Sequence, residues 1–307
     1  MVNTTQTFYS NGKLLITGEY LVLDGAKAFA LPTQKGQNLI ITPNQTDIIN
    51  WKSYDFDGSL WFEDSFTVQE ILVNQKLETT TIKSTLINIL HEALQLNPSF
   101  LNTEDGFNVE THLTFPRNWG LGTSSTLINN IAQWAKIDAF ELLKNSFGGS
   151  GYDIACAQNN TPIIYQIVDQ KPTVEPIKFS PEFKNKLYFV YLNKKQNSKT
   201  AIQSYHQNAK NRLSETIVTI DKITQKTIKA ETVEEFAKLV EQHESILSNI
   251  LELETIREKL FHDFKGVTKS LGAWGGDFVL AVAKENPTEY FKSKGFETVI
   301  PYQEIIL

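Results

Sequence analysis

Apolar residues in the first part of the chain recur mostly at the two-residue spacing of β-strands. Residues 48–56 and 59–64 alternate in this way on either side of Asp57-Gly58, a turn signal that predicts a hairpin. Residues 82–96 instead place apolar side chains three and four positions apart, which predicts a helix. Further β-rich segments, the first of them hairpin-like, cover 13–23, 38–43 and 106–115. Short strands are therefore expected to dominate this part of the chain.

The later part of the chain has a different pattern. Residues 199–262 are rich in apolar positions at helical spacing, and a glycine-rich loop then runs into an apolar strand within residues 267–283. A last helix is expected over 288–296 and a last strand over 297–303. Strands and helices alternate without regular βαβ units, so the predicted fold class is α+β.

A cluster of prolines suggests where two domains meet. Pro172, Pro176 and Pro181 lie between the strand-rich and the helix-rich parts of the chain. A chain of 307 residues is long enough for two domains. We therefore expect an N-terminal domain over residues 1–175 and a C-terminal domain over residues 176–307.

Charge and composition narrow the possible partners. The formal net charge is −6, which gives no electrostatic case for binding nucleic acid or an anionic membrane surface. The single cysteine, Cys156, excludes an intramolecular disulfide and a zinc site of the CxxC type. Charged residues interrupt the apolar N-terminal segment, and no apolar run approaches the length of a membrane span. A cytoplasmic protein, monomeric or homodimeric, is expected.

The segment GLGTSS, residues 120–125, stands directly before a helical apolar pattern. Gly120 and Gly122 allow backbone N–H groups to converge on one point, and the helix start adds its free N–H groups and its dipole. The three hydroxyl residues that follow can bind a phosphate or Mg²⁺. A glycine turn with a Ser/Thr helix cap would use the same residues, and the segment alone favours neither interpretation.

Two more glycine clusters carry candidate chemistry. In GGSGYDIACAQ, residues 148–158, Asp153 stands where a helix can start, and such a carboxylate stays ionised. It could accept or orient a hydroxyl proton during attack on phosphorus, or it could simply cap the helix. Cys156 is interpreted as a small core residue. The third cluster, within residues 270–282, either allows close backbone approach or forms a glycine-rich hairpin.

In their order along the chain, GKLLITGEYLVLDG, GLGTSS, GSGYDIA and GAWGGD resemble the motifs of the GHMP kinase superfamily. The resemblance covers nearly the whole chain and implies a two-domain α+β fold. Its N-terminal domain would be similar to a domain of ribosomal protein S5, and its C-terminal domain would be ferredoxin-like. Members of this superfamily transfer a phosphoryl group from Mg-ATP to small molecules, so ATP and Mg²⁺ are the implied cofactors.

The resemblance also assigns roles to individual positions. Asp153 matches a catalytic aspartate, and Lys13 matches a lysine that lies near that aspartate and the transferred group. Ser124 is implied as a Mg²⁺ ligand, and Glu141 is the nearest candidate for a second, although its spacing to Asp153 differs by one residue. The residues implied to bind the ATP phosphates are Gly120, Leu121, Gly122, Thr123, Ser124 and Ser125. The residues implied on the acceptor side are Glu19, Tyr20, Ser150, Ser198, Lys199, Thr200, Gly272, Gly275, Gly276 and Asp277.

Some of these positions remain open to a second interpretation. Glu19 and Tyr20 line the acceptor pocket or instead fix the first motif from behind it. Residues 198–200 belong to a loop over the acceptor or to a solvated basic turn. Trp51 and Trp61 flank adenine or simply pack within their hairpin. Trp274 stands where the superfamily usually has a small residue, so it would narrow or shield the acceptor site. No histidine is assigned a catalytic role.

The combination GEY, GYDIA and GGD is most similar to phosphomevalonate kinases, with mevalonate kinases next. The predicted function is therefore a Mg-ATP-dependent kinase of phosphomevalonate or mevalonate in isoprenoid precursor synthesis, with an anionic small-molecule acceptor. Two alternatives stay open. One is another member of the superfamily, such as a sugar kinase, a homoserine kinase or mevalonate diphosphate decarboxylase. The other is a catalytically inactive nucleotide-binding homologue.

Overall fold

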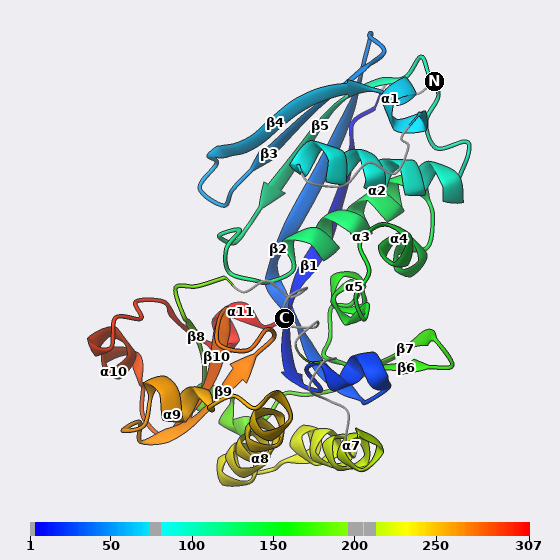
Figure 1. Cartoon of the computed structure of the whole chain (residues 1–307). Helices are drawn as coiled ribbons and strands as arrows, with labels where there is room; N and C mark the ends of the chain where they lie inside the picture. The colour runs from blue at the N-terminus through cyan, green and yellow to red at the C-terminus, as the bar shows by residue number, and fades with distance from the viewer. Residues whose placement is uncertain (1–3, 74–80, 196–204, 206–212) are drawn as a thin grey trace. The chain divides into compact units, whose positions relative to one another are not determined.

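The computed structural model describes residues 4–73, 81–195, 205 and 213–307 (Figure 1). Contacts divide the chain into two compact units, described separately below. The first unit consists of Met1–Gly12, Lys35–Arg117 and Leu121–Gln158; the second consists of Lys13–Gln34, Asn118–Gly120 and Asn159–Leu307. The units interleave along the chain because strands β1 (Gln6–Thr17) and β2 (Ala28–Asn44) each contribute residues to both. The domain boundary at residues 175/176 stays a prediction.

A sheet covered by helices forms the first unit. Its strands are the later part of β2, together with β3 (Ile48–Tyr54), β4 (Leu60–Thr67) and β5 (Gly106–Leu113), in the order β4-β3-β5-β2. The predicted hairpin at Asp57-Gly58 is confirmed, since β3 and β4 pair antiparallel on either side of it. β3 also pairs parallel with β5, and β5 pairs antiparallel with β2.

The helices of this unit follow the apolar periodicities of the sequence. α2 spans Ile82–Leu96, as predicted. Its apolar stripe joins one core with the inward-facing residues of the sheet, such as Leu39, Ile49 and Val109. The other helices are α1 (Val68–Leu72), α3 (Thr123–Ala135), α4 (Ala139–Ser146) and α5 (Tyr152–Gln158). Figure 1 shows α2, α3 and α4 over the same face of the sheet.

The second unit contains an antiparallel sheet in the order β11-β8-β10-β9. Every residue of β8 (Leu187–Tyr191) and β10 (Phe278–Ala283) is buried, because α9 and α10 pack on one face and α11 packs on the other through Phe189 and Tyr302. That double burial explains why these strands are continuous apolar runs without alternation. The strands at the two edges of this sheet are β9 (Gly266–Leu271) and β11 (Val299–Pro301). The second unit also contains a hairpin of β6 (Ile163–Val168) and β7 (Lys171–Pro176), and β6 pairs with Ala28–Ala30 of β2.

Helices make up most of the rest of the second unit. α7 (Leu213–Lys229) and α8 (Val233–Leu251) pack against each other, and they confirm the helix-rich prediction within the described residues. Shorter helices are α9 (Ile256–Leu260), α10 (Thr288–Ser293), α11 (Tyr302–Ile305), and the 3-10 helices η1 (Leu21–Asp24) and η2 (Glu182–Lys186). Within the described ranges, no helix has both the length and the apolarity needed to cross a membrane.

The hairpin-like prediction for residues 13–23 is wrong. β1 ends at Thr17, and the chain then turns into η1. Gly18 has φ +91°, and a Cβ there would lie 2.6 Å from the Lys27 carbonyl oxygen. Tyr20 has φ 61°, and the Val22 N–H donates to the Gly18 oxygen at 3.0 Å. Two left-handed backbone positions in three residues therefore end the strand, although the residues that follow have high β-propensity.

Replacing Phe261 by alanine tests the apolar core of the second unit. Phe261 is fully buried, and its ring contacts Phe291 at 5.1 Å and Phe296 at 5.4 Å between centroids. We expect Phe261→Ala to lower the free energy of unfolding by about 3–5 kcal/mol, as measured by urea denaturation. Phe56→Ala, at a position that is 56% exposed, is the control and should change it by less than about 0.5 kcal/mol. Equal effects would contradict this assignment of the core.

Candidate active site

The GLGTSS segment forms the start of α3, as predicted. Gly122 caps the helix with φ 99°, a conformation that glycine adopts without strain. The Ser125 hydroxyl is buried and donates back to the Gly122 carbonyl at 3.2 Å, and Thr126 does the same at 3.0 Å. Ser124 is exposed, and Thr123 Oγ1 is buried with no hydrogen-bond partner among the described residues. Thr123 and Ser124 therefore have the hydroxyls that remain available to a ligand.

Both of these hydroxyl residues line a pocket of about 350 Å³ in the first unit, here called the aromatic pocket. Its walls include Trp51, Trp61 and Phe62 from the hairpin, and residues of α2. Trp61 Nε1 and Thr111 Oγ1 are further buried polar atoms without a hydrogen-bond partner among the described residues, and both residues line the pocket. Apolar walls with a few unsatisfied polar atoms are typical of a small-molecule site.

The two tryptophans of this pocket differ in their surroundings. Trp51 is 1% exposed, and its indole N–H donates to Ser53 Oγ at 3.2 Å. Trp61 lies under the guanidinium group of Arg117, 5.1 Å from the ring centroid. Trp51 is therefore a packing residue of the hairpin, whereas Trp61 presents both an aromatic face and an unsatisfied donor at the pocket.

Asp153 lies in the first turn of α5, which packs against α3 in the same unit. Gln158, at the end of α5, donates to Asn129 of α3 at 3.0 Å and fixes the two helices together. Ser150 lies in the preceding loop and is partly exposed. Glu141, the suggested metal ligand, is exposed in the first turn of α4 and does not line the aromatic pocket.

In the second unit, three of the sequence motifs meet around one narrow cavity. Lys13 from β1, Gly120 from the GLGTSS loop, and Gly272 and Asp277 from the third motif all line it. Gly120 has φ +70°, and a Cβ at this position would lie 2.3 Å from Asp277 Cγ. A side chain at position 120 would therefore fit only if the Asp277 carboxylate moved away from it.

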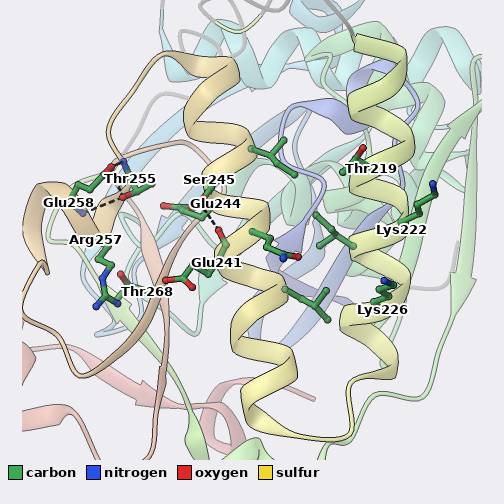
Figure 2. A pocket seen from close by; sticks show the side chains of 14 residues that line it. Thr219, Lys222, Lys226, Glu241, Glu244, Ser245, Thr255, Arg257, Glu258 and Thr268 are labelled. Atoms are coloured by element: carbon green, nitrogen blue, oxygen red, sulfur yellow. Dashed lines mark hydrogen bonds between the residues drawn. The ribbon is translucent and has the colours of Figure 1, made fainter.

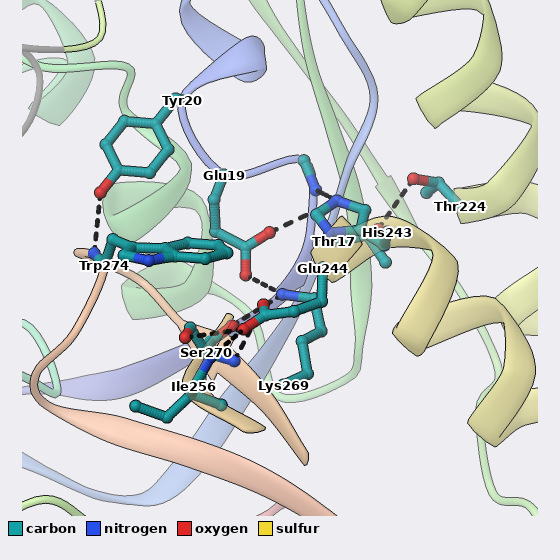
Figure 3. A network of polar contacts seen from close by, with 11 residues as sticks. Thr17, Glu19, Tyr20, Thr224, His243, Glu244, Ile256, Lys269, Ser270 and Trp274 are labelled. Carbon is teal, nitrogen blue, oxygen red and sulfur yellow. Dashed lines mark hydrogen bonds and ion pairs between the residues drawn. The ribbon is translucent and has the colours of Figure 1, made fainter. Parts of the chain in front are cut away.

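A network of buried polar groups lies behind the first motif in the second unit (Figure 3). The Lys269 ammonium group is fully buried, and it is paired with the Glu19 carboxylate and donates to the Ser270 carbonyl at 2.8 Å. Glu244 accepts hydrogen bonds from the backbone N–H and the hydroxyl of Ser270, at 3.1 and 3.0 Å. Glu19, at 2% exposed, is thus engaged within the protein, which favours its interpretation as a residue that fixes the motif.

Protonation in this network follows from burial and from the hydrogen bonds. The Gly18 N–H donates to His243 Nε2 at 2.9 Å, so that nitrogen carries no proton. Burial lowers the pKa of His243 well below its usual range, and the positive charge of Lys269 lowers it further. The approach of Glu19 Oε2 to Nε2, at 3.5 Å, is therefore not an ion pair. Burial raises the pKa of Glu19 to about 7, although Lys269 opposes that rise, and burial also raises the pKa of Glu244.

Sequence reasoning missed Lys269, Glu244 and His243. A signal for His243 was present, because it continues the apolar stripe of α8 formed by Phe236, Val240 and Leu247, all of which are buried. A histidine on such a stripe is buried and needs a hydrogen-bond partner. The partner itself, the backbone of Gly18, lies 225 residues away in sequence and has no sequence signal.

Other predicted acceptor residues are only partly placed. Gly275 and Gly276 lie in the loop between β9 and β10, and Tyr20 follows Glu19 with 7% exposure. Ser198, Lys199 and Thr200 fall outside the described residues.

A larger pocket of about 770 Å³ borders α7, α8 and α9 (Figure 2). It contains none of the predicted site residues, and its lysines, arginine and glutamates do not share one sign of charge.

The fold as a whole is shared with small-molecule kinases. Mevalonate kinase from Methanococcus jannaschii is similar with a TM-score of 0.69 and 19% identity over 97% of both chains. Phosphomevalonate kinase from Streptococcus pneumoniae, in complex with phosphomevalonate and AMPPNP, has a TM-score of 0.67 and a sequence identity of 17%, over 94% of this chain and 95% of that one. Galactokinase from Lactococcus lactis, in complex with galactose, has a TM-score of 0.66 and a sequence identity of 14%, over 94% of this chain and 88% of that one. No family profile and no curated protein sequence matches the chain. The likeness establishes the fold and leaves the acceptor open.

Replacing Gly120 by alanine tests its contact with Asp277. Gly149 is the matched control, since it also has positive φ (+107°), but a Cβ added there would have no atom of the described residues within 4 Å. We expect Gly149→Ala to cost about 1–2 kcal/mol of unfolding free energy from backbone strain alone. Gly120→Ala should cost about 1–3 kcal/mol more because of the clash. Asp277→Gly in the same chain should recover that difference, and equal costs for the two alanine variants would exclude the contact.

Replacing Glu19 by glutamine tests the effect of burial on its ionisation. A carboxyl group whose pKa rises from 4.5 to about 7 on folding stabilises the protein when protonated. That stabilisation is complete below about pH 4.5 and is lost as the pH rises through 7. The unfolding free energy of the wild type should therefore fall, relative to Glu19→Gln, by roughly 3 kcal/mol across this window. Glu289→Gln, at an exposed position, is the control. If the difference in unfolding free energy between the wild type and Glu19→Gln does not change with pH, Lys269 keeps Glu19 ionised.

Proposed function

We propose that this chain, whose fold is that of the GHMP kinases, is a Mg-ATP-dependent kinase acting on phosphomevalonate or mevalonate. One observation carries the proposal. The exposed start of α3 opens onto a pocket of suitable size whose buried polar atoms lack partners among the described residues. Backbone N–H groups at a helix start, with two hydroxyls beside them, suit the phosphates of a nucleotide. An aromatic pocket beside them suits its base.

The first unit supplies the residues that would hold the nucleotide. Thr123 and Ser124 would bind the phosphates through backbone N–H groups and hydroxyls, while Trp61 would stack on the base and donate its N–H. ATP, when bound, supplies the phosphoryl group to be transferred. Ser124 would also bind Mg²⁺ through its exposed hydroxyl. Glu141 as a further metal ligand remains a prediction that its exposed position does not strengthen.

Asp153 and Lys13 would act on the acceptor. Asp153 would orient the attacking oxygen and take its proton where the acceptor is a hydroxyl. An acceptor that is already a phosphate monoester is ionised near neutral pH, so Asp153 would then mainly orient it. Lys13, partly exposed, would reduce the repulsion between two anionic reactants. Positioning and charge stabilisation are most of what phosphoryl transfer requires from a protein.

The choice of acceptor rests on the motifs, because a galactokinase shares the same fold. The GEY, GYDIA and GGD segments support phosphomevalonate first and mevalonate second. Glu19 is poorly placed to bind an acceptor of either kind, since it is buried and paired with Lys269.

The experiment that tests this function measures ADP release from Mg-ATP with phosphomevalonate, mevalonate, galactose and homoserine offered separately. We expect an acceptor-dependent rate with one of the first two. Asp153→Asn should lower kcat by about 100-fold or more while ATP affinity stays within about threefold. Asp138→Asn is the matched control, because Asp138 caps α4 through the Phe140 N–H and asparagine caps equally well. Full turnover in Asp153→Asn would exclude the catalytic role. ATP binding without turnover on any acceptor would indicate the non-catalytic homologue.

A further inference from the structure

The pocket of about 770 Å³ beside α7, α8 and α9, here called the helix pocket, contains none of the residues assigned to the proposed reaction (Figure 2). All the residues that line it belong to the second unit. Its volume lies in the range of small-molecule sites in proteins, and charged, hydroxyl and apolar side chains all contribute to its walls. Which of these groups are free to bind a ligand depends on the hydrogen bonds that they already make.

Some charged groups of the helix pocket are already engaged within the protein. Arg257 donates to two backbone carbonyl oxygens. Glu258 accepts hydrogen bonds from the backbone N–H and the hydroxyl of Thr255, at 2.9 and 2.8 Å. Glu244 accepts two from Ser270, as described above. These three charged groups therefore stabilise the surrounding structure and leave little capacity for a ligand.

Three other charged groups of the helix pocket are exposed and uncommitted. Lys222 and Lys226 extend from α7, and a spacing of four residues places them on the same face of that helix. Glu241 belongs to α8. Among the described residues, the side chains of these three make no ion pair and no hydrogen bond. Two positive charges thus line the pocket from α7, and one negative charge lines it from α8.

A buried hydroxyl without a partner lies on the side of the helix pocket formed by β9. Thr268 is 2% exposed and lines the pocket, and its Oγ1 has no hydrogen-bond partner among the described residues. A buried polar atom of this kind costs free energy until a ligand or a water bonds to it. The helix pocket therefore combines uncommitted charges with an unused hydrogen-bonding group.

These groups lie on two sides of α8. That helix packs against both α7 and β9, and Figure 2 shows it between the two lysines and Thr268. A ligand that contacts both sides must therefore extend across α8. The apolar side chains of Ile223 and Ile246 also line the pocket, and a hydrocarbon chain can pack against them.

We propose that the helix pocket binds an elongated zwitterionic small molecule, a linear amino carboxylate, with its carboxylate at Lys222 and Lys226 and its ammonium group at Glu241 and Thr268. A simple anion would leave Glu241 unpaired, and a simple cation would be repelled by the two lysines. An ammonium group has only donors, whereas a carboxylate and a hydroxyl can both accept, so the second end of the ligand matches its partners. This site is separate from the proposed kinase site.

The first test measures binding to the wild-type chain by isothermal titration calorimetry, with 4-aminobutyrate, 6-aminohexanoate and 8-aminooctanoate as probes. We expect the affinity to rise by about tenfold or more along this series, because only the longer molecules reach across α8. Octanoate lacks the ammonium group and should bind about tenfold more weakly than 8-aminooctanoate. Equal affinity of these two, or no saturable binding of any amino carboxylate up to about 20 mM, would overturn the proposal.

Charge variants locate the binding. Lys222→Met combined with Lys226→Met should weaken the binding of 8-aminooctanoate by about tenfold or more, and Glu241→Gln should remove most of its advantage over octanoate. Lys229→Met is the matched control, because Lys229 is exposed on the same helix and does not line the pocket. Unchanged affinity in the double lysine variant would overturn the site. So would a wild-type dimer that this variant dissociates, since the pocket would then lie in an interface between copies.

Thr268→Val tests the buried hydroxyl while keeping the shape of the side chain. Because this hydroxyl has no partner among the described residues, its removal should leave Tm unchanged or raise it. The same variant should weaken the binding of 8-aminooctanoate by about threefold or more, since the ammonium group loses an acceptor. A lower Tm with unchanged affinity would show that the hydroxyl serves the fold and would overturn its role in the site. None of these measurements needs turnover, so a failure of the proposed kinase function would not affect them.

Discussion

The burial of one lysine constrains much of the second unit. An ammonium group removed from water costs several kcal/mol unless it is paired and hydrogen-bonded, and Lys269 is fully buried. Its pairing with Glu19 joins two segments that lie 250 residues apart in sequence. Because Glu19 is buried as well, neither partner can move away without leaving an uncompensated charge. The turn after β1 and strand β9 are therefore held together by a pair that cannot lose either partner without leaving the other buried and unpaired.

The same constraint extends to the loops that carry the sequence motifs. Gly18, before Glu19, donates its N–H to His243, which fixes the first motif against α8. At the other end, the Asp277 N–H donates to the Lys194 carbonyl at 2.8 Å, and its own carbonyl accepts from the Leu192 N–H at 2.8 Å. Asp277 takes φ 52°, an uncommon conformation for a side-chain-bearing residue, which these two hydrogen bonds stabilise. The glycine-rich loop of the third motif, between β9 and β10, is thus fixed at its end by the backbone contacts of Asp277. At its centre it is fixed by the hydrogen bonds of Trp274 to Tyr20 and Glu254.

The two units would make different contributions to the proposed reaction. The helix start and the aromatic pocket of the first unit have the features expected for a nucleotide site. The second unit holds Lys13, the first motif and the third motif, which would bear on the acceptor in the proposed reaction. Kinases of mevalonate, phosphomevalonate and galactose share this fold, so selectivity must come from side chains placed on a common scaffold.

The sequence by itself determined those elements whose signals are local. The hairpin at Asp57-Gly58, helix α2 over Ile82–Leu96 and the α+β class follow from turn residues and apolar periodicity, which act between near neighbours. The order of the motifs was enough to predict the kind of fold. Residues 13–23 were mispredicted because two left-handed backbone positions outweighed the β-propensity of the side chains. Only the tertiary structure decided that Glu19 is internal, that Lys269, Glu244 and His243 support the first motif, and that Trp274 has a fixed orientation. Those outcomes depend on which distant groups compensate a buried charge, and the spacing of residues along a chain does not encode such partners.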